Sequence, residues 1–141
     1  MGLMNRRTVM AFCILFAACL APVFSTGCRR DEPEIEDAFP VELQGGWKRA
    51  AVVRITDVPA EISQVGNPTA VAVTTYTGQG AVRVRAYRMK NQTLAFELQQ
   101  KYHNADELAA ARGPLFYVAM LTNTDRGTAM AVLSELRRAG Q

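Results

Sequence analysis

Histidine and cysteine are nearly absent from the part of the chain that follows residue 28. Of the 141 residues only His103 is a histidine, and the three cysteines all lie at or before Cys28. One histidine and at most one cysteine cannot build a zinc site of histidine and cysteine ligands. We therefore predict no metal and no cofactor. We expect His103, near a helix end, to cap that helix or to face solvent.

The sequence patterns that accompany common catalytic machinery are missing too. Ser63 and Ser134 are the only serines after position 28, and neither stands in a Gly-x-Ser-x-Gly setting. There is no Gly-x-Gly-x-x-Gly sequence and no phosphate-binding loop. Asp106 and Glu107 are adjacent acids at the expected start of a single helical turn within a connection, where acids are favoured for structural reasons. We predict no catalytic residue and no enzymatic activity.

Acidic residues do not occur in the first 27 positions, which have the order of a bacterial secretory leader. Arg6 and Arg7 make a short positive start, residues 8–24 are almost wholly apolar, and residues 25–27 are small. The apolar run of 17 residues is near the lower limit for crossing a bilayer, so a retained transmembrane anchor is the alternative. Two adjacent arginines leave twin-arginine export open beside the general route.

A cysteine stands directly after this leader. Ser25-Thr26-Gly27-Cys28 resembles the lipobox of bacterial lipoproteins, whose usual form is Leu-Ala/Ser-Gly/Ala-Cys, with serine here in place of leucine. In that family the sulfur takes a diacylglyceryl group, the leader is cut before the cysteine, and the new amine is acylated. The resemblance implies that Cys28 is the lipidated first residue of the mature protein. Cutting before Cys19 is the alternative, but it would leave the apolar residues 20–24 exposed beside the membrane.

The resemblance also implies a location. The protein is expected in the bacterial cell envelope, anchored to a membrane by its lipid and facing the periplasm or the exterior. Two or three acyl chains hold a protein stably, at about 0.8 kcal/mol per buried methylene, whereas one chain binds reversibly. Arg29 stands where an aspartate would resemble the inner-membrane retention signal of enterobacterial lipoproteins. The outer membrane is therefore favoured where the organism has one.

Residues 28–40, CRRDEPEIEDAFP, contain the predicted lipidated cysteine and few apolar side chains. A segment with five acids and two prolines buries too little surface to offset its chain entropy. We predict a disordered acidic tether that reaches about 40 Å when stretched, followed by a folded domain at 41–141. That domain has 12 basic and 8 acidic side chains. Such a mild excess favours anionic partners but is too small to indicate a nucleic acid partner.

Apolar periodicity within 41–141 predicts a small α+β domain. Thr77-Gly78-Gln79-Gly80 is typical of a turn, so its flanking runs are predicted to form an antiparallel hairpin. The predicted strands are 51–56, 69–76, 81–87 and 115–120, and the predicted helices are 91–102 and the segment after Thr124-Asp125. Residues 57–68 and 104–113 are predicted as connections. The order β-β-β-α-β-α predicts an antiparallel or mixed sheet of about four strands, with two helices packed on one face.

Trp47, the only tryptophan, follows a Gly45-Gly46 turn and is predicted to close the edge of the core. Gly46-Trp47-Lys48-Arg49, taken with the later hairpin, resembles uncharacterised exported bacterial proteins that begin with a Gly-Trp-Lys motif. That likeness implies no particular activity.

Alternating side chains in the strand 81–87 indicate one candidate binding surface. Val82, Val84 and Ala86 point to one side, and arginines and a tyrosine point to the other. The predicted ligand-binding residues of this outer face are Arg54, Tyr76, Arg83, Arg85 and Tyr87. Guanidinium groups bind phosphate or carboxylate by forked hydrogen bonds while aromatic rings stack on a ligand. The alternative is a solvated face without a ligand, which is common in antiparallel sheets.

Together these features predict a membrane-anchored, non-enzymatic envelope lipoprotein. Its partners would be the membrane, through the lipid, and an anionic glycan, a lipid or an envelope protein. The alternative is a structural or assembly subunit of a larger envelope complex.

Overall fold

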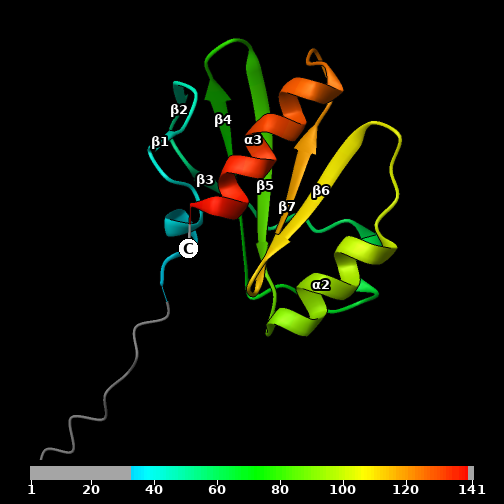
Figure 1. The fold of residues 1–141 in the computed structure, drawn as a ribbon. Coiled ribbons are helices and arrows are strands. Elements are labelled where there is room, and N and C mark those ends of the chain that lie inside the picture. The colour runs from blue at the N-terminus through cyan, green and yellow to red at the C-terminus, as the bar shows by residue number, and fades with distance from the viewer. Residues whose placement is uncertain (1–32, 140–141) are drawn as a thin grey trace, which may run out of the picture. The chain divides into compact units, whose positions relative to one another are not determined.

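Antiparallel strand pairing organises residues 33–139, the part of the chain that the computed structural model describes. The leader, Cys28 and the start of the predicted tether lie outside the described residues. In chain order the elements are η1 (Ile35–Ala38), β1 (Glu42–Leu43), β2 (Trp47–Arg49), β3 (Val53–Arg54), α1 (Ala60–Ser63), β4 (Ala70–Thr77), β5 (Ala81–Arg88), α2 (Gln92–Lys101), β6 (Glu107–Arg112), β7 (Leu115–Met120) and α3 (Arg126–Arg138) (Figure 1). The predicted α+β class is confirmed.

The sheet is larger than the predicted one. Its strand order is β1-β2-β4-β5-β7-β6, with β3 also paired to β4, and every pairing is antiparallel. The hairpin of β4 and β5, the strand β7 and the helices α2 and α3 are confirmed. The side chains of Asn91 and Asp125 cap the two helices by accepting from the backbone N–H groups of Leu94 and Thr128. Within residues 33–139, no helix is both long and apolar enough to cross a bilayer.

Strand β6 is the main element that the sequence did not predict. Its sequence, ELAAAR, lies in the expected connection 104–113 and consists of residues with low strand propensity. Tertiary packing determines the strand instead: Leu108 and Ala110 are buried in one core, and Ala109 packs against the other. Conversely, the predicted strand 51–56 is reduced to the two residues of β3, and the expected loop 57–68 contains the short helix α1.

Both faces of the sheet are covered by helices, so the prediction of helices on one face is wrong. One core lies between the sheet and α3, and it includes Tyr76, Tyr117 and Leu133. A second core lies between the opposite face and α1 and α2, and it includes Phe116 and Leu98. The cause is β7, whose successive residues are buried in alternate cores, so both sides of the strand need a cover (Figure 1).

The tether predicted for residues 28–40 is wrong from residue 33 onward. Ile35, Ala38 and Phe39 are each only 1% exposed and pack into the core on the α3 side. The hydroxyl of Tyr76 donates to the carbonyl oxygen of Pro40 at 2.9 Å, and a second tyrosine hydroxyl, from Tyr117, donates to that of Ala38 at 2.9 Å. We call residues 33–40 the N-terminal clasp, because they are held against the sheet.

Candidate functional site

Three of the five predicted ligand-binding residues project from β5 toward the face that α2 partly covers. Tyr87 is buried against Phe116, with ring centroids 6.1 Å apart, and burial raises the pKa of the Tyr87 hydroxyl. Arg83 is exposed, while Arg85 is half-buried with its guanidinium beside the Tyr87 hydroxyl. The Nε atom of Arg85 is enclosed and has no hydrogen-bond partner among the described residues. This face therefore offers guanidinium groups, but the predicted stacking ring of Tyr87 is buried and cannot contact a ligand.

The other two predicted residues, Arg54 and Tyr76, lie on the opposite face, so the predicted common surface is wrong. The turn between β4 and β5 is one residue shorter than expected: Thr77 pairs with Ala81, and Tyr76 therefore pairs with Val82. A shift of pairing by one residue moves side chains to the other face of a strand. Tyr76 accordingly points into the core under α3. Arg54 pairs with Ala72, whose side chain lies in the same core, so Arg54 is on that face as well.

Arg54 already has anionic partners within its own chain. Its guanidinium forms two hydrogen bonds to the carboxylate of Glu36, at 2.6 and 2.9 Å, and a further one to Glu34. Arg88 donates to the backbone carbonyl oxygens of Pro33 and Glu34, the latter at 2.9 Å. Two arginines thus hold the N-terminal clasp by its carboxylates and its backbone, and Arg54 has little capacity left for an external ligand.

The ion pair between Arg54 and Glu36 gives the first testable prediction. Hydrogen bonds from the guanidinium lower the pKa of Glu36 from its ordinary 4.5 to about 2. Because the folded-state pKa is the lower one, this pair stabilises the fold above pH 4.5, and that contribution is lost as the pH falls toward 2. We expect a carboxyl titration followed by NMR to give this low pKa in the native chain and an ordinary value in Arg54→Gln. An ordinary Glu36 pKa in the native chain would contradict the contact.

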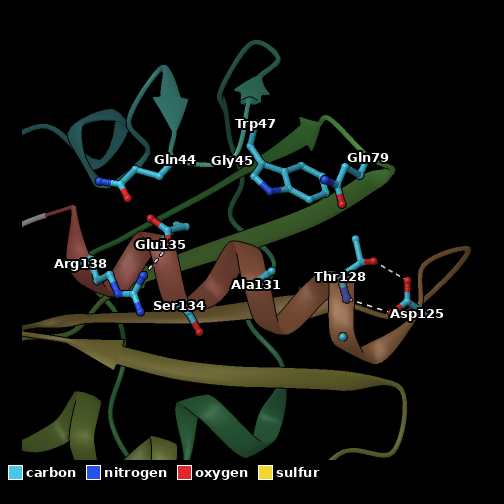
Figure 2. Close-up of a pocket in the computed structure, with 11 residues that line it drawn as sticks. Gln44, Gly45, Trp47, Gln79, Asp125, Thr128, Ala131, Ser134, Glu135 and Arg138 are labelled. Carbon is cyan, nitrogen blue, oxygen red and sulfur yellow. Dashed lines mark hydrogen bonds and ion pairs between the residues drawn. The ribbon is translucent and has the colours of Figure 1, made fainter.

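One groove on the described surface runs along α3. Its volume is about 720 Å³, and it is lined by Gln44, Gly45, Trp47, Gln79, Asp125, Gly127, Thr128, Ala131, Ser134, Glu135 and Arg138. Figure 2 shows the indole of Trp47 beside Gln79 at one end and the pair of Glu135 and Arg138 at the other. Trp47 is buried and closes the edge of the core, as predicted. Its ring fits because Gly78 has no side chain: a Cβ there would lie 2.9 Å from the indole.

The acids of this groove have structural partners. Asp125 accepts hydrogen bonds from the backbone N–H of Thr128, at 2.9 Å, and from the hydroxyl of the same residue, and these bonds lower the pKa of Asp125. Glu135 is paired with Arg138 at 2.8 Å.

His103 is exposed and lines a separate cavity of about 100 Å³. Residues 33–139 contain no group of three or more His, Cys, Asp or Glu side chains that could hold a metal.

A second groove lies beside the first, at the C-terminal half of α3. It has a volume of about 500 Å³ and is lined by Ala111, Arg112, Gly113, Ser134, Arg137 and Arg138, with no acidic side chain among its lining residues. We call it the arginine groove. Ser134 and Arg138 line both grooves, so the two are adjacent.

Arg112 has a fixed position in the arginine groove. Its Nη1 donates to the carbonyl oxygen of Leu136 at 2.6 Å, and its guanidinium carbon lies 5.6 Å from the centre of the Tyr117 ring. In the sequence, Arg137 and Arg138 are ordinary residues for a helix C-terminus. Arg112 belongs to the strand that the sequence did not predict. No sequence signal connected the three arginines, because it is the pairing of β6 with β7 that brings Arg112 to α3.

Comparison with known proteins gives no relative: no family model, no curated protein sequence and no solved structure matches this chain.

Proposed function

We propose that this chain is a bacterial lipoprotein, anchored at Cys28, whose folded unit binds an anionic ligand of the cell envelope in the arginine groove and catalyses no reaction. The leader and its resemblance to a lipobox support the anchor and the location. The observation that supports binding is the groove itself, where three arginines and no acid are among the lining residues, and where only Arg138 has an acidic partner, Glu135. Phosphate and carboxylate groups of envelope lipids and glycans are the ligands that this chemistry fits.

The geometry of the groove favours binding for two reasons. Its volume of about 500 Å³ lies within the usual range of ligand sites, roughly 300–1,000 Å³. Arg112 is already held by Leu136 and Tyr117, so little side-chain entropy is lost when its remaining N–H groups meet an anion. Each hydrogen bond to a charged group contributes about 1.5–3 kcal/mol.

The test neutralises the two exposed arginines of the groove. We expect Arg137→Ala with Arg138→Ala to weaken retention on peptidoglycan sacculi or on anionic vesicles by at least about tenfold, since two charge-assisted contacts are lost. The matched control is the double variant Lys101→Ala with Arg126→Ala, which removes two other exposed charges. This variant should retain binding. Equal retention by both folded variants would contradict a site in the groove.

A second candidate function, as an assembly subunit, is favoured by the uncovered part of the α2-side sheet face. Val53, in the two-residue strand β3, is 55% exposed, and Arg83 is exposed on the same face. An exposed apolar side chain and an exposed cation on one sheet face suit a protein partner. Cross-linking in intact cells distinguishes the two functions: a discrete protein adduct at Val53 favours the assembly subunit, and its absence favours the ligand-binding module.

A further inference from the structure

Basic side chains surround the point where the described chain begins. Arg88 donates to the carbonyl oxygen of Pro33, and both residues line a hollow of about 250 Å³ together with Lys90 and Pro114. Pro114 directly follows Gly113, a lining residue of the arginine groove. We call this surface the basic end, and it consists of Arg88, Lys90, Arg112, Arg137 and Arg138.

Strand register explains why these residues meet. Arg88 ends β5 and Arg112 ends β6, and both pair with Leu115, the first residue of β7 between them. Two strand spacings separate the arginines, which is roughly 10 Å. The side chains of both residues flank Tyr117 on the α3 side, where their charges lower the pKa of its hydroxyl, although burial dominates and raises that pKa to about 12. The C-terminal turn of α3 adds its exposed arginines to the same end.

The acids near the basic end cancel only part of this charge. Glu34 and Glu36 both pair with Arg54, which is outside the basic end, so one of these two negative charges is not offset by it, and Glu135 is paired with Arg138. Asp37, in the clasp, is exposed. Lys90 and Arg137 are exposed and have no ion pair among the described residues. A positive surface therefore remains at this end of the sheet.

The clasp also shortens the connection to Cys28. Only residues 29–32 lie between Cys28 and Pro33, and five Cα-to-Cα steps span at most about 18 Å. A free tether through residue 40 would have allowed about twice that distance. An anchor at Cys28 thus keeps the end of the fold that contains Pro33 near the lipid head groups, within roughly two Debye lengths at physiological salt.

We infer that the basic end docks on the surface of an anionic phospholipid bilayer, with Lys90 and Arg137 among the head groups. The inference rests on the proposed anchor and names the ligand of the proposed module. Each lysine or arginine near an anionic surface strengthens binding about fivefold. The anchor adds a high effective concentration, because docking becomes an intramolecular step. The bound orientation directs the β4–β5 turn and β2 away from the membrane (Figure 1).

The experiment measures docking without the lipid. The chain from residue 28 onward, with Cys28→Ser, contains the whole compact unit that begins at Glu32, so it can be tested in solution. We expect it to sediment with vesicles of phosphatidylglycerol and phosphatidylcholine, to be released by high salt, and not to sediment with phosphatidylcholine alone. Lys90→Glu with Arg137→Glu should lower the partition coefficient at least about tenfold. The control, Arg83→Glu with Arg126→Glu, has the same total charge and should bind like the parent chain.

Two results would overturn the inference: no sedimentation with the anionic vesicles, or equal loss in both double variants. The first result excludes docking, and the second shows that only net charge matters. Neither result affects the anchor, because lipidation of Cys28 is measured separately on protein from cell membranes. If sacculi still bind through the arginine groove while vesicles do not, the proposed function stands and membrane docking is wrong.

Discussion

Replacing Phe39 with alanine is expected to lower the free energy of unfolding by about 3–5 kcal/mol. Phe39 is 1% exposed and packs edge-to-face on Tyr117, with ring centroids 6.3 Å apart. Its removal leaves a cavity between the clasp and the sheet, and it loosens the segment whose Ala38 carbonyl oxygen accepts from the Tyr117 hydroxyl. This is a large effect for a residue whose local sequence is typical of a disordered linker.

Thermal unfolding of the chain from residue 28 onward measures this effect. For a domain of about 100 residues, the expected loss lowers the melting temperature by at least about 12 °C. The control is the neighbouring substitution Val41→Ala, because Val41 is 63% exposed and its truncation should change stability by less than about 0.5 kcal/mol. If both variants melt like the parent chain, residues 33–40 do not form part of the fold in solution.

Replacing Cys28 with serine is expected to abolish the processed, membrane-held form of the protein. A hydroxyl at this position offers no thiolate to accept the diacylglyceryl group, and in the lipoprotein family the leader is cut only before the modified cysteine. We expect radioactive palmitate incorporation in cells to fall to background, and the protein to persist only as the longer precursor. The physical basis is that stable anchoring requires at least two acyl chains.

The alternative cleavage site provides the matched control for this experiment. Cys19→Ser should be labelled, processed and retained in the membrane like the native chain, because Cys19 is removed with the leader when Cys28 is modified. If Cys19→Ser loses the label and Cys28→Ser retains it, the anchor lies at residue 19. In that case the connection to Pro33 is longer and the basic end is no longer confined near the bilayer.

The sequence correctly predicted the elements that depend on patterns among neighbouring residues. The hairpin of β4 and β5 follows from two strand-like runs around a glycine-rich turn, and α2 and α3 follow from helical spacing and their caps. The clasp could not be predicted in this way. Its apolar residues Ile35, Ala38 and Phe39 lie among acids, and their burial depends on tyrosine hydroxyls from β4 and β7 that are distant in sequence.

The prediction of the candidate binding surface was wrong for a different reason. Alternation in β5 correctly grouped Arg83 with Arg85, but the face of β4 depends on the pairing across the turn. That pairing begins at Thr77 and Ala81, one residue away from the expected position. A single-residue difference in turn length is below the precision of sequence patterns, and it reverses every side chain of the strand. The arginine groove likewise depends on long-range pairing of β6 and β7.

Intact-mass analysis of the native protein, extracted with detergent from bacterial membranes, tests whether lipid at Cys28 holds this unit at the membrane. We predict a chain that begins at Cys28, with a diacylglyceryl group on the sulfur and an acyl group on the new amine. A membrane protein that retains residues 1–27, or one that begins at residue 28 with an unmodified thiol, would contradict the anchor and the membrane-proximal position inferred from it.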